Sequence, residues 1–182
     1  MNPPNLITIV RAILVPVVFW LLMTGHTLSA FFLFIAAGLS DALDGFLAKR
    51  YNWQTELGAH LDPLADKLLL VSVFIALGSL RELPFWLVVM VVSRDVLIVL
   101  AVMVSWLMNH PVKMKPHVVS KANTLAQIAL AAIVLADMSF ALELGHVRTL
   151  LVWLTAVLTI ASLFTYLRAW IAHMGRFESG QV

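Results

Sequence analysis

The chain contains no cysteine, and this absence excludes disulfide bonds and thiolate metal sites. Charged residues are scarce as well, because they make up 12% of the 182 residues, against about a quarter in a typical soluble domain. Hydrophobic residues make up 62%. One core of this length could not bury so much apolar side chain, so we expect lipid to be the solvent of its outer surface. A Walker-type phosphate loop is also absent from the sequence.

The basic residues do not suggest a nucleic-acid partner. The net charge is only +2, and the Lys and Arg residues are scattered along the chain. Their distribution is more informative as a signal of membrane topology.

Six apolar segments are each long enough to cross a bilayer, which takes about 20 helical residues. Short polar or turn-forming stretches such as "TGHT" and "SLREL" separate them. We therefore predict an all-α integral membrane protein, with six transmembrane helices in a single domain of residues 1–182. The helices are expected at about Leu6–Met23, Leu28–Ala48, Leu61–Leu80, Pro84–Met108, Val119–Leu142 and Val147–Met174.

The basic residues of the connections predict the orientation. One set of connections, with the C-terminus, holds Lys49, Arg50, Lys113, Lys115, Arg168 and Arg176. The other set holds only Arg81 and Arg148. This imbalance places both termini in the cytoplasm. No basic cleavable leader precedes the first helix, which favours a bacterial inner membrane, with the mitochondrial inner membrane as the alternative.

Four aspartates lie in this apolar chain within the stretch from Ser40 to Leu70. Asp41 and Asp44 are three positions apart, and Asp62 and Asp66 are four apart, so each pair shares a helix face. The two helices are joined by a short loop, and we expect them to be antiparallel neighbours whose acidic faces meet. Four facing carboxylates repel each other unless divalent cations bind between them. Two Mg²⁺ or Mn²⁺ ions suit such an oxygen-rich site.

Each aspartate also has a simpler explanation. Asp62 precedes Pro63 and could cap a helix that begins there. Asp41 and Asp44 could be solvated at a helix end, and Asp66 could form an ion pair with Lys67. Four such coincidences within one membrane hairpin are less plausible than a shared function, because ionisable groups inside a membrane are costly.

The spacing in this stretch is specific. Asp41-x2-Asp44-Gly45-x2-Ala48-Lys49-x8-Gly58-x3-Asp62-x3-Asp66 resembles the signature D-x2-D-G-x2-A-R-x8-G-x3-D-x3-D of the CDP-alcohol phosphatidyltransferases. Lys49 stands where the pattern has arginine, which keeps the charge but loses the planar two-pronged donor. Enzymes of this family transfer a phosphatidyl or related group from a CDP-linked lipid to an alcohol and release CMP.

The resemblance implies a role for each matching residue. Asp41, Asp44, Asp62 and Asp66 are the expected ligands of two divalent cations, and Asp66 is also the expected general base. A homodimer and a cytoplasmic active site are implied as well. The expected contacts to the CDP-lipid are Gly45, Lys49, Thr55 and Gly58, together with Asn5 and Thr8 of the early stretch "PNLIT". For Gly45 and Gly58, close helix packing is the alternative.

The acceptor alcohol is predicted from charges further along the chain. Arg94 and Lys121 are candidate acceptor-binding residues, although Arg94 could merely neutralise Asp95 and Lys121 could reach the membrane surface. The segments "SRDV", "KP" and "SKANT" resemble those of the CMP-forming cardiolipin synthases. This favours a glycerol-containing lipid, phosphatidylglycerol, as acceptor. Glycerol 3-phosphate, the acceptor of phosphatidylglycerophosphate synthases, is the alternative.

Two functions of other kinds also use aspartates within membranes. A carboxylate-based transporter would place its site at the bilayer midplane between repeats, yet here the aspartates gather near one membrane face and no repeat is evident. An intramembrane prenyltransferase would carry two acidic motifs on well-separated helices of a longer chain. Neither fits the sequence as well as phosphatidyl transfer does.

Replacing Asp66 by Asn tests the proposed base. Asp66→Asn keeps the size of the side chain but cannot accept the proton of an attacking hydroxyl. We expect turnover to fall by at least about 10²-fold, while the helix content seen by circular dichroism is unchanged. Normal turnover in this variant would show that Asp66 is not the base.

Overall fold

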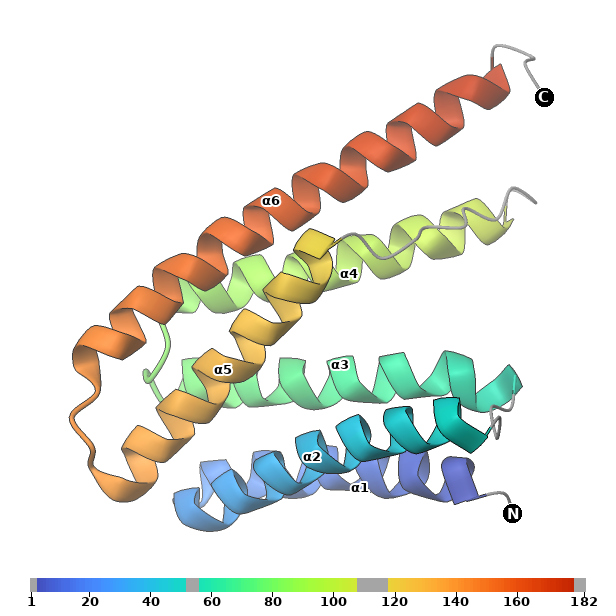
Figure 1. The fold of residues 1–182 in the computed structure, drawn as a ribbon. Helices are drawn as coiled ribbons and strands as arrows, with labels where there is room; N and C mark the ends of the chain where they lie inside the picture. Colours follow the sequence, from blue (N-terminus) through green and yellow to red (C-terminus); the bar gives the residue numbers. More distant parts are fainter. Residues whose placement is uncertain (1–2, 52–55, 108–117, 179–182) are drawn as a thin grey trace.

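The computed structural model describes the backbone of residues 3–51, 56–107 and 118–178. It describes the side chains of residues 13–40, 67–100, 103, 118–168 and 170. All regular structure in these parts of the chain is α-helical, as the sequence predicted. The helices in Figure 1 are α1 (Pro3–Met23), α2 (Thr27–Tyr51), α3 (Glu56–Ser79), α4 (Phe85–Leu107), α5 (Val118–Phe140) and α6 (Gly145–Glu178).

The start of α3 differs from the expectation in a way that matters for the aspartates. The helix begins at Glu56 rather than at Leu61. Asp62 therefore lies more than one turn inside the helix, and Pro63 is not at its first position. The explanation of Asp62 as a plain N-terminal cap is wrong.

Residues in left-handed conformations end the helices at the short connections. Gly25, with φ of 81°, follows α1, and Arg81, with φ of 62°, follows α3. The amide of Glu82 donates to the carbonyl of Leu77 at 2.8 Å, so the turn satisfies a carbonyl that the helix end leaves free. A side chain at this φ costs roughly 1–2 kcal/mol relative to the right-handed conformation. Gly25 adopts this left-handed conformation without strain, whereas Arg81 adopts it at that cost.

The helices form a closed ring. Going around it, α1 contacts α2, α2 contacts α5, α5 contacts α6, α6 contacts α4, α4 contacts α3, and α3 contacts α1. A further contact between α3 and α5 crosses the ring. The start of α1 and the end of α6 lie at the same end of the bundle (Figure 1).

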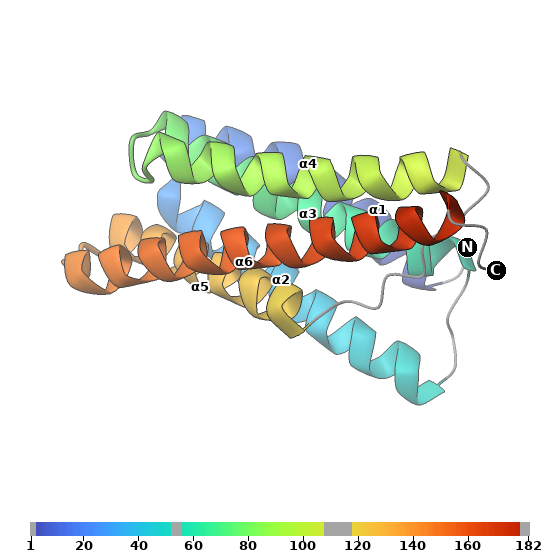
Figure 2. The ribbon, with the colours of Figure 1, turned by 90° about the horizontal axis from the view of Figure 1, so that it is seen from above.

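The expected side-by-side packing of the second and third helices is not what the described residues show. The two run in opposite directions, as expected (Figure 1). Within the described part of the chain, however, α2 packs on α1 and α5, whereas α3 packs on α1, α4 and α5. The reason is that α1 lies against both helices and takes the place of a direct contact. Figure 2 shows α2 diverging from the bundle towards its C-terminal end.

Among the side chains that the structure describes, an apolar core fills the half of the bundle that ends in the three short connections. Helix α3 contributes most to it, because Leu69, Leu70, Val73, Phe74, Ala76 and Leu77 are all buried. Val18 and Leu22 of α1 and Leu130 and Val134 of α5 pack around them. The buried polar side chains, by contrast, are concentrated on α4, α5 and α6.

Helix α6 is polar on its inner face and apolar on its outer face. Thr155, Thr159 and Ser162 are buried, whereas Trp153, Val157 and Phe164 are more than 60% exposed. A surface helix in water shows the reverse pattern. In the described residues, Val118–Phe140 and Gly145–Arg168 are long and apolar enough to cross a membrane, and Ile13–Met23, Thr27–Ser40 and Lys67–Ser79 are shorter apolar stretches.

Gly78 sets the approach of α3 to α4. A Cβ atom on Gly78 would lie 2.9 Å from Cγ2 of Val88, whereas one on Gly38 of α2 would meet nothing within 4 Å. We expect Gly78→Ala to lower the midpoint of thermal unfolding in detergent, because the stiff Val88 side chain must move. The matched control Gly38→Ala is expected to leave the midpoint unchanged or to raise it. Equal midpoints for the two variants would contradict the close contact.

Candidate functional site

The aspartate positions fall near one end of the bundle. Asp41 and Asp44 lie in the C-terminal half of α2, and Asp62 and Asp66 lie in the N-terminal half of α3. These helix halves point to the end that also holds the start of α1, where Asn5 and Thr8 are found (Figure 1). Gly45 and Lys49 lie in α2 and Gly58 in α3, whereas Thr55 lies outside the described residues. The side chains of these residues are not among those described, so their roles stay predictions.

Lys67 connects the acidic segment of α3 to α4. It follows Asp66 directly, and its Nζ donates to Oδ1 of Asp95 at 3.5 Å. Lys67 is 36% exposed, whereas Asp95 is 9% exposed. The bond is long, and an ammonium group has three donors. Lys67 therefore keeps donors that it can offer to another anion.

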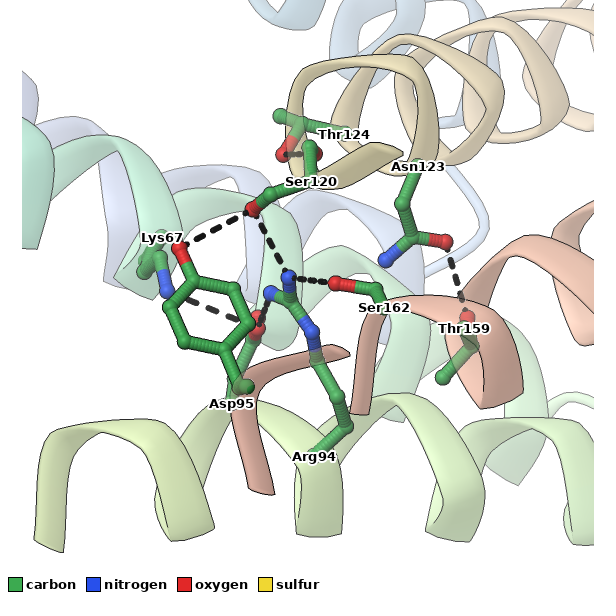
Figure 3. Close-up of polar contacts among 9 residues, drawn as sticks. Lys67, Arg94, Asp95, Ser120, Asn123, Thr124, Thr159 and Ser162 are labelled. Atoms are coloured by element: carbon green, nitrogen blue, oxygen red, sulfur yellow. Dashed lines mark hydrogen bonds and ion pairs between the residues drawn. The ribbon is translucent and has the colours of Figure 1, made fainter. Parts of the chain in front are cut away.

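Arg94 is the largest of the fully buried side chains among the described residues, with 2% of its surface exposed. Its Nη1 donates to Oδ1 of Asp95 at 2.5 Å. Its Nη2 donates to Oγ of Ser120 on α5 at 2.9 Å and also to Oγ of Ser162 on α6. Figure 3 shows these bonds converging on the guanidinium group from three helices. An isolated charge here would be very costly, and these partners compensate it.

A second group of contacts extends the network. The hydroxyl of Tyr166 donates to Oγ of Ser120 at 3.4 Å, and the Arg94 guanidinium carbon lies 5.5 Å from the centre of the Tyr166 ring. That distance permits a cation–π contact. Ser120 thus accepts hydrogen bonds from α4 and from α6, and the three helices are connected through one hydroxyl.

The polar interior continues one turn deeper. Oγ1 of Thr159 donates to Oδ1 of Asn123 at 2.9 Å, as Figure 3 shows. Nδ2 of Asn123, Nε2 of Gln127, Oγ1 of Thr155 and Nε of Arg94 are buried without a hydrogen-bond partner among the described residues. Buried donors of this kind usually bind ordered water or a ligand. Four buried polar atoms on α4, α5 and α6 therefore remain able to bind such a partner.

The structure separates the two predicted acceptor-binding residues. Arg94 is buried and paired, which is the arrangement expected if it neutralises Asp95. Lys121, at the start of α5, is exposed. Nothing in this geometry tests acceptor binding itself, so that role remains a prediction for both residues.

Four members of the network were not predicted: Lys67, Ser120, Ser162 and Tyr166. The sequence contains a partial signal for the two on α6, because Thr155, Thr159, Ser162 and Tyr166 recur at helical spacing within an apolar helix. It contains no signal that this face would meet Arg94, which lies 68 positions before Ser162.

Comparison with known proteins identifies the family. Residues 1–172 match the model of the CDP-alcohol phosphatidyltransferases. The chain belongs to this family. The matched residues include all four aspartates and the Arg94 network.

The named relatives fall into two groups, the glycerol-3-phosphate 3-phosphatidyltransferases and the CMP-forming cardiolipin synthases. The chain is 38% identical to a chloroplastic CDP-diacylglycerol–glycerol-3-phosphate 3-phosphatidyltransferase of Oryza sativa, over 91% of this chain and 56% of that protein. It is 34% identical to the CMP-forming cardiolipin synthase of Rattus norvegicus, over 90% of this chain and 59% of that protein. It is 32% identical to the CDP-diacylglycerol–glycerol-3-phosphate 3-phosphatidyltransferase of Shigella flexneri, over 92% of this chain and 94% of that protein. The chain thus spans little more than half the length of the rice and rat relatives.

The Arg94–Asp95 pair can be tested by removing one partner or both. Asp95→Ala leaves a buried guanidinium without its counter-ion, and we expect a loss of about 3–5 kcal/mol in the free energy of unfolding. Replacing both residues, as Arg94→Met with Asp95→Leu, removes the buried charges together and is expected to cost less than Asp95→Ala alone. Unfolding in detergent, followed by circular dichroism, measures both effects. A double variant less stable than Asp95→Ala would contradict the compensation described above.

Proposed function

We propose that this protein transfers the phosphatidyl group of CDP-diacylglycerol to the hydroxyl of a glycerol-containing acceptor and releases CMP. The observation that carries the proposal is the eight-position aspartate motif, which matches at seven positions and lies within the residues matched by the family model. Its halves lie in helix segments directed to the same end of the bundle.

The donor set suits divalent cations. Asp41, Asp44, Asp62 and Asp66 offer only carboxylate oxygens, and each pair has the spacing of a shared helix face. Hard cations such as Mg²⁺ and Mn²⁺ prefer these ligands. When bound, two such ions would offset the charge of the diphosphate and of the leaving CMP.

The chain's own residues would supply the remaining functions. Asp66 would accept the proton of the acceptor hydroxyl as that oxygen attacks the phosphorus of the phosphatidyl group. Lys67, bound to Asp95, places a positive charge next to Asp66 in the sequence. Gly45, Lys49, Thr55 and Gly58, with Asn5 and Thr8, would hold the CDP-lipid. Catalysis would rest mainly on positioning and on charge, as in other phosphoryl transfers.

Phosphatidylglycerol is the acceptor that we propose. The Arg94 guanidinium already donates to Asp95, Ser120 and Ser162, so its charge is largely compensated within the protein. Of the other described cations near this network, Lys67 is paired with Asp95, whereas Lys121 and Arg168 are exposed. Such a site suits one phosphodiester charge better than the two charges of a phosphate monoester. The similarity to cardiolipin synthases points the same way.

Glycerol 3-phosphate is the second candidate acceptor. The similarity to the rice and Shigella flexneri proteins favours it. Arg94 and Lys121 would then bind the monoester phosphate, after Arg94 had exchanged a serine partner for a phosphate oxygen.

The membrane placement is part of the proposal. The apolar outer face of α6 and the polar inner face support lipid as the surrounding solvent. We propose that all six helices cross the bilayer with both termini and the aspartates on the cytoplasmic side, in the bacterial inner membrane or the mitochondrial inner membrane. A homodimer stays a prediction from the family resemblance.

Release of CMP by the purified protein tests the reaction and the acceptor together. The protein is given CDP-diacylglycerol with Mg²⁺ or Mn²⁺, and either phosphatidylglycerol or glycerol 3-phosphate in separate reactions. We expect CMP and cardiolipin from the first reaction, and loss of both when a chelator removes the metal. Product lipids are identified by mass spectrometry.

Other outcomes of this assay discriminate between the proposals. Phosphatidylglycerophosphate from the second reaction alone would reject phosphatidylglycerol as acceptor and keep the metal-dependent transfer. CMP release that is indifferent to the chelator would reject the metal site. The absence of CMP with either acceptor would reject the proposed activity.

A further inference from the structure

A cavity of about 730 Å³ lies at the end of the bundle opposite the aspartates. It is formed by the α3–α4 connection and the first turns of α4 and α6, which come from distant parts of the chain. The residues that matter for its chemistry are Arg81, Glu82, Trp86, Arg148, Thr149 and Trp153. Gly78 lies about 16 Å along α3 from Lys67, at ~1.5 Å per residue, so this cavity is separate from the proposed reaction site.

The charges of this cavity favour an anion. Nη2 of Arg148 lies 2.8 Å from Oε2 of Glu82, and the pair is half-buried. Arg81 is exposed and has no ion pair among the described residues. Two guanidinium groups and one carboxylate therefore line the cavity. Arg81 and Arg148 are also the only Lys or Arg residues in or beside the three connections at this end of the bundle, and both line the same cavity.

The rim of the cavity has the composition of a membrane interface. The rings of Trp86 and Trp153 lie 5.7 Å apart and are 44% and 62% exposed. Tryptophan is enriched at the level of lipid headgroups, because its ring is apolar and its N–H is polar. In the proposed membrane placement, a positive cavity next to two such rings would lie at the level of the phospholipid phosphates.

The cavity continues into an apolar groove between α3 and α4. This groove has a volume of about 290 Å³ and shares Gly78 and Phe85 with the cavity. Ile75, Val89 and Val92 line it further along the two helices. A largely apolar cavity that contains two guanidinium groups and lies beside an apolar groove matches a phospholipid, whose charged headgroup is joined to hydrocarbon chains.

We propose that this cavity binds one phospholipid with an anionic headgroup. Its phosphate contacts Arg81 and Arg148, and one acyl chain lies in the groove between α3 and α4. The inference relies on the proposed membrane placement but not on the transfer reaction. The occupant is a lipid rather than free phosphate, because the groove adds apolar contact that an inorganic ion cannot use.

Native mass spectrometry of the full chain in detergent tests this site. The probe is dioleoyl phosphatidic acid, which has no hydroxyl that could act as acceptor and no CMP to release. It is compared with dioleoyl phosphatidylcholine, whose headgroup is neutral overall. We expect more phosphatidic acid adduct than phosphatidylcholine adduct on the unmodified protein. Arg81→Gln combined with Arg148→Gln should reduce this preference about tenfold.

A matched control separates the cavity from the charge of the whole protein. Lys113→Gln combined with Lys115→Gln removes the same charge from the other set of connections. We expect this control to keep the preference for phosphatidic acid. An equal loss in both double variants, or no preference in the unmodified protein, would overturn the proposal.

Three further measurements identify the occupant. Val89→Trp fills the groove and should weaken the binding of dioleoyl phosphatidic acid but not of its dihexanoyl analogue. Competition by millimolar inorganic phosphate as effective as that by the lipid would show an ion site instead. A change in the proportion of dimer in Arg81→Gln with Arg148→Gln would show that the cavity is an interface between copies.

The same preparations separate this proposal from the transfer reaction. Arg81→Gln with Arg148→Gln is expected to release CMP at the rate of the unmodified protein. Absence of CMP release from the unmodified protein would reject the proposed activity and leave the lipid adducts to be judged by themselves.

Discussion

The arrangement of α3, α4, α5 and α6 depends on the compensation of one buried charge. Arg94 is almost completely enclosed, and its donors end on Asp95, Ser120 and Ser162. Lys67 joins the same carboxylate from α3. Because a buried guanidinium without partners is very unfavourable, these contacts constrain the four helices to one relative placement. The constraint acts next to Asp66, where the proposed chemistry needs precise positioning.

The described side chains hold the helices together in two different ways. Near the short connections, side chains such as Phe74 and Leu77 pack in an apolar core, and Gly78 allows α4 to approach. Further along α4, α5 and α6, the described side chains include buried hydroxyls, amides and charges. Within a lipid surrounding, helix contacts gain little from the hydrophobic effect, so close packing and hydrogen bonds must supply the attraction. The buried polar contacts cost more to assemble than apolar ones, because each buried polar group must find a partner.

The two ends also suit different contacts with phospholipid. The aspartates and the Arg94 network belong to a region proposed to handle headgroups and diphosphate during the reaction. The cavity beside Arg81 and Arg148 has a net positive charge, tryptophans at its rim and an apolar groove below. Both ends meet the same two physical needs of a phospholipid. These needs are charge compensation for the phosphate and apolar contact for the acyl chains.

The sequence alone determined the helical class, the approximate bounds of all six helices and the aspartate motif. Each of these depends on residues close together in the chain: long apolar runs, turn-forming breaks, and spacings of three and four. It also suggested the pairing of Arg94 with its neighbour Asp95. Only the tertiary structure decided that Ser120, Ser162 and Tyr166 share Arg94, that α1 contacts both α2 and α3, and that Arg81 lies in one cavity with Arg148. These contacts join residues tens of positions apart, and helical periodicity specifies which face is polar but not which helix will meet it.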